Sequence, residues 1–269
     1  KAIKIITIKD RTTETQLAKA YNIKYGTFRF WKNKNAVPLN IAYDLLTRAK
    51  IKINLHHVNV ARQKQKIKYP KLCPELFRFI GYILGDGHLT KNNVMLHNSN
   101  IKLRKEFLEL GEKLFNIKGK EEFPKNRVPK SIFNSKFMAM IMHEVFSVPY
   151  GNKARIIKTP NQLYLMGNNC VSNFLSALFN CESYVGPQEI EFSTTSSFIA
   201  PELCNLLLRF SIVPRLITRK NHYRIYISGY NNLLAFREHV GYTHPNKLEI
   251  LNLNLSRPIK RLISNVDLI

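Results

Sequence analysis

Two carboxylates, Asp86 and Glu182, each stand at the end of an apolar segment with the length of a short helix. Carbonyl groups at a helix C-terminus carry partial negative charge, so two such carboxylates brought together create a field that favours a divalent cation. Carboxylate and carbonyl oxygens suit Mg²⁺, which stabilises the attacking and leaving oxygens when a phosphodiester bond is hydrolysed. A carboxylate in a Gly-Asp-Gly turn is also compatible with an ordinary helix end. The pairing of Asp86 with Glu182 favours the metal site.

The elements that must position these carboxylates occur twice along the chain. Each copy begins with the apolar segment, at residues 76–84 and 174–179, and continues with short strands and helices in the same order. We expect these elements at residues 94–97, 103–115, 120–123, 128–134 and 137–146 in the first copy, and at residues 189–194, 199–210, 215–219, 223–228 and 231–240 in the second.

The two copies keep one register. Asn152-Lys153 and Asn246-Lys247 close them, and the lysines follow Asp86 and Glu182 by 67 and 65 residues. The fold class expected is α+β (mixed α/β), with two pseudo-symmetric αββαββα halves at residues 73–167 and 168–269.

The residues from Phe79 to Gly87 (FIGYILGDG) resemble the nine-residue motif of the LAGLIDADG homing endonucleases, and those from Leu175 to Ser183 (LSALFNCES) match it more loosely. The resemblance implies a monomer whose two motif helices pack side by side, with two antiparallel sheets forming a saddle over double-stranded DNA. The small residues Gly81 and Ala177 would allow that close approach.

We therefore expect Asp86 and Glu182 to be catalytic metal ligands for Mg²⁺, with Mn²⁺ as a substitute. The carbonyls of Gly85 and Cys181 are lesser candidates for ligands. Family members often use a Lys or Gln to polarise water, and this residue is not evident in the sequence. The candidates for this catalytic role are His97 and Asn98, followed by Lys136 and Thr195, and His97 also fits a DNA contact or a surface position.

The second motif departs from the family pattern at three positions. Ala177 and Ser183 replace glycines, and Asn180 replaces an acidic residue. Because serine adopts a left-handed conformation less readily than glycine, we expect strain or a changed shape at Ser183, with weaker cleavage.

Strand alternation over residues 223–228 places Arg224, Tyr226 and Ser228 opposite Tyr223 and the two isoleucines. The polar face is expected to meet DNA, although a solvated charged face is the alternative. The expected DNA contacts of the two halves are Lys91, Asn98, Lys125, Arg127, Lys130, Thr195, Arg215, Arg219, Lys220, His222, Arg224 and Tyr226.

Residues 1–60 are expected to form a small all-α domain. Short helices are predicted around residues 16–19 and 27–31 and after Pro38, with a turn at residues 21–23. This pattern resembles the helix-turn-helix of phage-repressor-like proteins, whose second helix enters the major groove. A small helical packing module with solvated charges is the alternative. The expected shared core is Leu17, Ala20, Ile23, Phe28 and Trp31, and the DNA contacts implied are Lys24, Tyr25, Thr27, Arg29 and Lys32.

Residues 61–72 are polar and basic, which predicts a linker that either follows a phosphate backbone or is simply solvated.

The whole chain carries 42 Lys+Arg against 18 Asp+Glu, a formal charge of +24, so nucleic acid is the expected partner. No apolar stretch approaches the roughly 20 residues that span a bilayer, and the first residues do not resemble a signal peptide. We expect an intracellular protein that is not secreted. Its four separated cysteines argue against a zinc site or a disulfide framework.

These features favour a site-specific endonuclease that cuts both DNA strands. A related DNA-binding regulator that has lost cleavage is the first alternative, supported by the degenerate second motif and opposed by Glu182. An RNA-splicing maturase that binds intron RNA is the second. An intein is less favoured, because Lys1 is not a Cys or Ser nucleophile and the sequence ends in Asp267-Leu268-Ile269.

Overall fold

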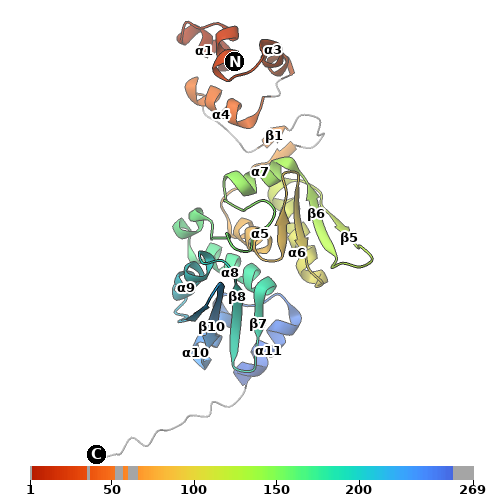
Figure 1. The fold of residues 1–269 in the computed structure, drawn as a ribbon, viewed down its shortest axis with the longest axis vertical. Helices are drawn as coiled ribbons and strands as arrows, with labels where there is room; N and C mark the ends of the chain where they lie inside the picture. Colours follow the sequence, from red (N-terminus) through yellow and green to blue (C-terminus); the bar gives the residue numbers. More distant parts are fainter. Residues whose placement is uncertain (1, 35–36, 52–56, 60–65, 257–269) are drawn as a thin grey trace, which may run out of the picture. The chain divides into compact units, whose positions relative to one another are not determined.

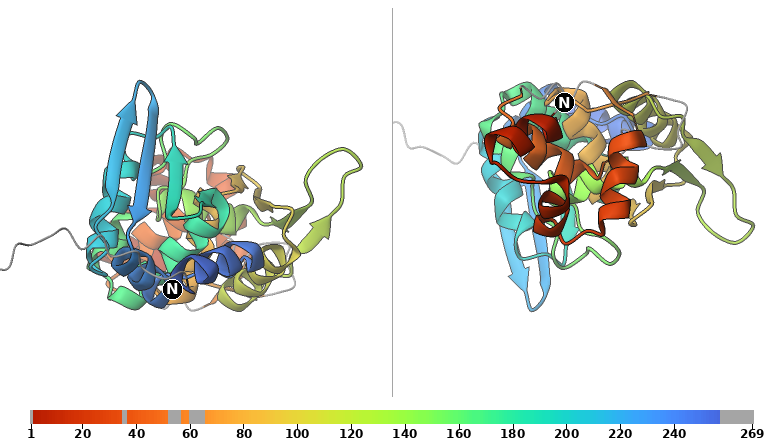
Figure 2. Two further views of the ribbon diagram at one scale, coloured as in Figure 1. Left: turned by 90° about the horizontal axis from the view of Figure 1, so that it is seen from below. Right: turned by 90° about the horizontal axis from the view of Figure 1, so that it is seen from above.

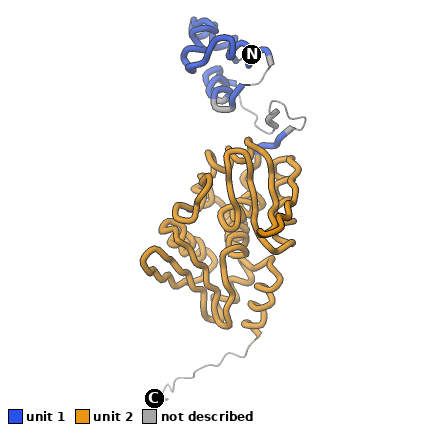
Figure 3. The backbone as a smooth tube through the Cα atoms, turned by 45° about the vertical axis from the view of Figure 1, so that its right-hand side comes forward, with its two compact units in different colours: residues 1–69 blue, residues 70–269 orange. Residues whose placement is uncertain are grey.

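The computed structural model describes residues 2–34, 37–51, 57–59 and 66–256. The chain divides into two compact units, residues 1–69 and 70–269 (Figure 3). Across the described residues, every helix is too short or too polar to cross a lipid bilayer.

Unit 1 is mainly helical. Thr13 caps its second helix through a reciprocal pair of hydrogen bonds with Gln16. Leu17 and Phe28 enter the core as predicted, but Ala18 is buried there and Ala20 is exposed, because Leu17 and Ala18 face the core from one side of the helix. The elements of unit 1 are α1 (Ala2–Lys9), α2 (Glu14–Ala20), α3 (Tyr25–Lys34), α4 (Leu39–Arg48), β1 (His57–Asn59) and β2 (Lys66–Lys68).

The two strands of unit 1 pair antiparallel, so β2 lies within the segment predicted to be a linker. Residues 61–65 of that segment lie outside the described residues.

Unit 2 contains the two predicted αββαββα halves, which confirms the fold class. Its first half comprises α5 (Pro74–Leu84), β3 (Gly87–Leu89), β4 (Asn93–His97), α6 (Ile101–Phe115), β5 (Lys120–Glu122), β6 (Lys130–Asn134) and α7 (Lys136–Glu144). The short helix η1 (Asn161–Leu165) lies between the halves. The second half comprises α8 (Asn168–Glu182), β7 (Ser183–Val185), β8 (Glu189–Thr194), α9 (Ile199–Leu208), β9 (Arg215–Arg219), β10 (His222–Ser228) and α10 (Tyr230–His239), and is followed by α11 (Pro245–Ser256).

Each half contains one four-stranded antiparallel sheet, in the orders β3-β4-β6-β5 and β7-β8-β10-β9 (Figure 1). The registers correspond, since Gly87 pairs with Leu96 in the first sheet and Ser183 with Phe192 in the second. In β10, Ile225 and Ile227 are fully buried while Arg224 is exposed, as the alternation predicts. The β5–β6 and β9–β10 hairpins project from the two halves (Figure 2).

The helices α5 and α8 pack against each other between the sheets (Figure 1). A Cβ atom added at Gly81 would lie 2.6 Å from the carbonyl oxygen of Phe174 and 2.9 Å from the Cβ of Ala177. One added at Gly85 would lie 2.6 Å from the Cβ of Cys181. The two glycines therefore permit a backbone approach that any larger side chain would block.

Candidate metal centre and nucleic-acid interface

The two carboxylates occupy corresponding places at the ends of the paired helices. Asp86 follows Gly85, the C-cap of α5, and Glu182 is the last residue of α8. Burial raises the pKa of Glu182, the Asp86 carboxylate raises it further, and the ammonium groups of Lys153 and Lys247 oppose both effects. The helix ends next to these carboxylates meet, because a Cβ atom added at Gly85 would lie 2.6 Å from the Cβ of Cys181, and this contact brings Asp86 and Glu182 to one site.

Asn98 holds one oxygen of Asp86. Its amide nitrogen donates to Oδ2 of Asp86 at 2.6 Å, and its own Oδ1 accepts from the backbone N–H of Asn100 at 2.7 Å. The buried Arg104 fixes the same turn by donating to the carbonyl of Asn98 at 2.8 Å. Asn98, expected to contact DNA or polarise water, therefore lies in position to orient Asp86.

Two lysines cap the helices that carry the carboxylates. Nζ of Lys153 donates to the carbonyls of Ile83 at 2.8 Å and Gly87 at 2.6 Å, and also to that of Gly85. Nζ of Lys247 donates to the carbonyls of Phe179 at 3.2 Å and Asn180 at 2.7 Å. The sequence register pointed to both lysines, but it did not predict that they would reach the helix ends.

Burial lowers the pKa of Lys153 to about 8 and also lowers that of Lys247. At neutral pH the ammonium group of Lys153 remains largely charged, and the carboxylates Asp86 and Glu182 favour the charged form of both lysines. They reduce the repulsion between Asp86 and Glu182 when no other cation is bound.

The side chains present fit a magnesium or manganese ion. Among the described residues, three or more His, Cys, Asp or Glu side chains do not converge anywhere on one point, so Asp86 and Glu182 would be the only ligands of this kind. Mg²⁺ commonly uses one or two carboxylates and completes its coordination with water and substrate phosphates.

The backbone carbonyl of Gly85 and the thiol of Cys181 lie at the two positions predicted to supply lesser ligands. The carbonyl of Gly85 accepts a hydrogen bond from Lys153, which argues against its binding a dication. Beside Asp86, the thiol of Cys181 is kept neutral, because burial raises its pKa well above the ordinary value.

The residue His97 ends β4 beside this site. Its backbone N–H donates to the carbonyl of Asp86 at 3.1 Å. Burial lowers the pKa of the imidazole, and the charges of Lys130 and His88 lower it further. A neutral imidazole at pH 7 is therefore available beside the carboxylate.

A cleft of about 440 Å³ opens next to Glu182. Lys153 and Glu182 line it together with His222 and the hydroxyl residues Ser193, Thr194 and Thr195. Thr195, predicted to contact DNA, donates from its hydroxyl to the carbonyl of Ala154 at 3.0 Å, which ties the cleft wall to the segment between the halves.

The expected strain at Ser183 is absent from the structure. Ser183 has φ −95° and ψ 154°, an extended conformation, so this position does not require glycine. Its hydroxyl donates to the carbonyl of Phe179 at 2.6 Å. Asn180 is 1% exposed, and its Oδ1 accepts the backbone N–H groups of Thr243 at 3.0 Å and His244 at 2.8 Å. Both departures are thus fully accommodated near Glu182.

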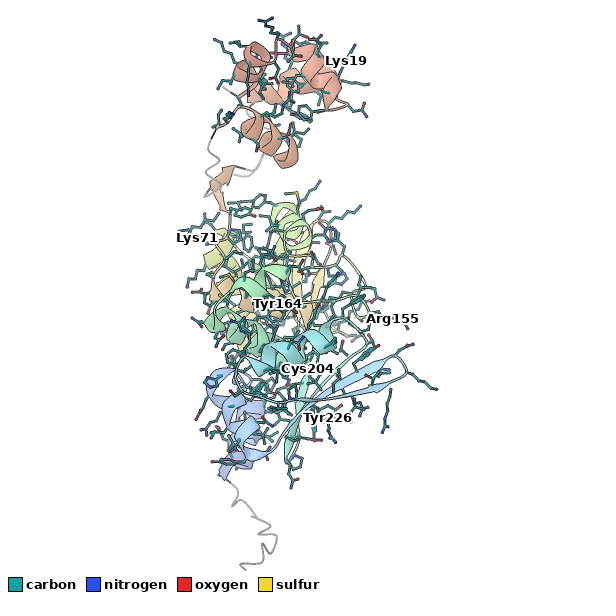
Figure 4. The ribbon with its side chains drawn as sticks, turned by 90° about the vertical axis from the view of Figure 1, so that its left-hand side faces the viewer. Lys19, Lys71, Arg155, Tyr164, Cys204 and Tyr226 are labelled. Atoms are coloured by element: carbon teal, nitrogen blue, oxygen red, sulfur yellow. The ribbon has the colours of Figure 1, made fainter. Side chains whose placement is uncertain are left out.

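The outward face of the second sheet carries the predicted basic residues. Arg215 lies over the ring of Tyr226 with its guanidinium carbon 5.0 Å from the ring centroid, and Tyr226 lies at the β9–β10 hairpin (Figure 4). Arg224 pairs with Glu191 at 3.4 Å. Arg219, Lys220 and His222 are exposed around the tip of the hairpin.

In the first half, exposed cations occupy two loops. Lys91 lies in the turn between β3 and β4, and Lys125 and Arg127 lie in the loop between β5 and β6. Lys130 pairs with Glu122 at 3.0 Å, so its charge is partly neutralised. Lys136, a weaker catalytic candidate, begins α7.

The remaining predicted contacts belong to unit 1. Lys24, Tyr25, Thr27 and Arg29 are exposed at and along α3. Lys32 is bound to Glu14 of α2 in an ion pair.

Residues 169–241 match the family model described as a LAGLIDADG-like domain. Over 186 residues, 66% of this chain, the sequence is 35% identical to a replication factor C small subunit of Methanocaldococcus jannaschii, of which it covers 10%. It is 28% identical over 242 residues, 87% of this chain, to a probable translation initiation factor IF-2 of Thermococcus kodakarensis, of which it covers 20%. The chain thus spans about a tenth to a fifth of the length of these relatives.

Among solved structures, I-DmoI in complex with DNA and Mn matches 62% of this chain and 96% of its own, with a TM-score of 0.48 and 13% identity. Full-length DUF199/WhiA from Thermatoga maritima matches 70% of this chain and 63% of its own, with a TM-score of 0.46 and 17% identity. The family model covers most of the second half, from the start of α8 to the end of α10. Similarity to a LAGLIDADG-like domain is therefore shown for residues 169–241.

Proposed function

We propose that this protein is a site-specific endonuclease that hydrolyses phosphodiester bonds in both strands of double-stranded DNA. One observation carries the proposal: Asp86 and Glu182 lie at corresponding ends of two helices that touch at Gly85 and Cys181. The LAGLIDADG-like match over residues 169–241 supports the same activity for the second half.

Each residue of the proposed active site would have a separate role. Asp86 and Glu182 would hold a magnesium or manganese ion, with Asn98 fixing the orientation of Asp86. When bound, the metal supplies Lewis-acid stabilisation of charge on the phosphate. Lys153 and Lys247 would supply positive charge beside the carboxylates, and the neutral imidazole of His97 would accept a proton from water.

The DNA would lie across the outward faces of the two sheets. The exposed cations of the β9–β10 hairpin and of the first-half loops are suited to phosphate contacts on either side of the metal centre. Because both halves belong to one chain, a monomer would supply both carboxylates.

The variety of proteins that this chain matches supports a segment that can be inserted into unrelated proteins. The chain matches a replication factor, an aminotransferase, a component of an ATP synthase and a translation initiation factor, and covers only 10–22% of each. Because these names share no common activity, the matched segment is best explained as an insert separate from the functions named. A DNA endonuclease fits an insert that moves between genes.

The test is incubation of the protein with a genomic DNA library and Mg²⁺ or Mn²⁺, followed by sequencing of new ends. Wild-type protein should produce defined double-strand breaks, whereas Asp86→Asn and Glu182→Gln should abolish them and retain DNA binding. Sequence-selective binding without cleavage in either metal would instead identify a non-cleaving regulator. Stronger binding to folded intron RNA than to duplex DNA at raised salt would identify a maturase.

A further inference from the structure

The residue that stands beside the central carboxylate differs between the two halves. The registers of the two sheets place Ser193 in the second half where His97 stands in the first. The imidazole of His97 occupies this position beside Asp86, whereas the short side chain of Ser193 leaves space beside Glu182. The cleft of about 440 Å³ lies there, and Ser193 and Glu182 both line it.

A histidine enters this cleft from a different strand. In the first sheet His97 pairs with Lys130, and two residues before Lys130 stands Val128, which is 49% exposed. The residue at the corresponding position in the second sheet is His222, which lines the cleft. Each half therefore has one histidine near its carboxylate, on β4 in the first half and on β10 in the second.

The polar lining of the cleft favours an anion. His222 is exposed at the start of β10, so a ring N–H can be donated to a ligand. Lys153 supplies charge, since its ammonium group already donates to helix carbonyls. The hydroxyl of Thr194 accepts from the backbone N–H of Ser196 at 3.1 Å and can donate its own proton. Glu182 is the carboxylate proposed to bind metal, which would balance its charge.

The rest of the lining is apolar and firmly held. Leu84, Ile157 and Phe192 form this part of the cleft. The buried hydroxyl of Ser196 donates to the carbonyl of Ile157 at 2.6 Å, and Thr195 donates to that of Ala154 at 3.0 Å. Phosphate oxygens suit the donors, and the attached deoxyribose suits the apolar wall, so the lining fits one unit of a DNA backbone.

We propose that His222 binds a single backbone phosphate of one DNA strand in the cleft beside Glu182, while His97 acts on the other DNA strand beside Asp86. The inference rests on the proposed function, because that function places duplex DNA across this face. The imidazole donates a hydrogen bond to a phosphate oxygen and so holds the backbone for hydrolysis of that strand alone. Loss of either histidine then affects one DNA strand.

The first test measures binding without cleavage. It uses the Glu182→Gln chain in EDTA, because this change removes a negative charge from the cleft and the proposed hydrolysis. A preferred duplex is first selected from DNA of random sequence. Its phosphates are then replaced one at a time by an uncharged methylphosphonate, which should weaken binding about tenfold at the phosphate that His222 contacts.

Adding His222→Ala to this chain should weaken binding to the unmodified duplex about tenfold. The methylphosphonate at the contacted phosphate should then cause no further loss, because both partners of one interaction have been removed. Methylphosphonates in the other DNA strand should keep their effects.

The second test follows the two DNA strands separately in an otherwise wild-type chain. His222→Ala should slow hydrolysis of one strand roughly 10–100-fold and leave the other within about threefold, and His97→Ala should do the reverse. His222→Gln keeps a nitrogen donor and should restore most of the rate. His239→Ala is the matched control: it removes an exposed histidine from α10 and should change neither strand.

An unchanged methylphosphonate pattern in His222→Ala would overturn the proposal even in a protein that cleaves DNA. Equal slowing of both strands by His222→Ala would overturn it as well. The expected pattern in a chain that hydrolyses no DNA would support the phosphate site and remove the proposed endonuclease. Failure to bind duplex DNA at all would overturn both.

Discussion

Asn98 donates a hydrogen bond of 2.6 Å to Asp86 and so fixes one of the two central carboxylates. Thr194 follows Phe192 as Asn98 follows Leu96, so it occupies the corresponding position in the second half. Its hydroxyl instead accepts from the backbone N–H of Ser196 at 3.1 Å. The two halves are therefore unequal: Asp86 is oriented by a neighbouring amide, while the partner position supports its own loop.

This inequality predicts different effects of two matched substitutions. Asn98→Ala should reduce cleavage by roughly 10–100-fold, as expected for residues that orient metal ligands. Thr194→Ala should change cleavage less than about threefold, because the Thr194 hydroxyl accepts a hydrogen bond from Ser196 of its own loop and orients neither carboxylate. The measurement is the single-turnover cleavage rate at saturating Mg²⁺, with DNA binding measured in EDTA. Equal losses in the two variants would contradict the orienting role of Asn98.

The raised pKa of Glu182 predicts an unusual pH range for metal binding. A carboxylic acid must lose its proton to bind Mg²⁺, so affinity should fall on acidification at a higher pH than for an ordinary glutamate. Asp86→Asn removes a negative charge and should lower the pKa of Glu182. Lys153→Met removes a positive charge and should raise it. The measurement is a pH titration of the Glu182 carboxyl by carbon NMR, and shifts of the same sign in both variants would refute the shared site.

The same shift has a consequence for stability. Because the folded-state pKa of Glu182 is raised, the folded protein binds more protons than the unfolded chain between the two pKa values, so its stability falls as pH rises through that window. Asp86→Asn should reduce this loss and raise the melting temperature at pH 7, but not below both pKa values. An unchanged melting temperature at pH 7 would place the two carboxylates too far apart to interact.

The repeated architecture could be predicted from the sequence because its longer elements have clear periodicity. Helix α11 was missed for a physical reason: Leu251, Leu253 and Leu255 alternate with asparagines, which is the pattern of a strand. In the structure Leu251 and Leu255 are buried one helical turn apart, while Leu253 is 53% exposed. Packing against the second half thus overrides the local pattern.

The positions of Asp86 and Glu182 were predictable from the repeat, but their immediate partners were not. Lys153 reaches the carbonyl of Ile83, 70 residues earlier in the chain, and Asn98 reaches Asp86 across a strand pair. Such contacts depend on how helices and strands pack together, and they produce no repeating pattern of residue types in the sequence. At Ser183 the sequence predicted strain that the structure does not contain. The strain was inferred from the residue type, but the backbone there is extended and accepts a serine.

The contact between α5 and α8 at Gly85 and Cys181 predicts that a second substitution can rescue the first. Gly85→Ala would place a Cβ atom 2.6 Å from that of Cys181 and should destabilise unit 2 by about 1–3 kcal/mol. Adding Cys181→Gly removes the clashing atoms and should recover part of the loss, so a double-mutant cycle should give a favourable coupling energy. Gly186→Ala is the matched control: its nearest contact would be 3.4 Å and it should change stability by less than about 0.5 kcal/mol. Additive effects of Gly85→Ala and Cys181→Gly in denaturant unfolding would show that the helices do not meet there.

The cations of the β9–β10 hairpin are expected to determine part of the salt dependence of DNA binding. Arg219→Ala combined with Lys220→Ala should reduce the slope of log K against log salt by roughly 1.8, because each phosphate contact to duplex DNA contributes about 0.9. The loss should be similar for all sequences, since phosphates carry no base information. The matched control removes two cations from helices that pack on the sheets, Lys105 of α6 and Arg237 of α10. These two changes lower the net charge equally but lie away from the outward sheet face, so they should leave the slope nearly unchanged. Equal slopes for the two double variants would mean that net charge, and not the hairpin, binds DNA.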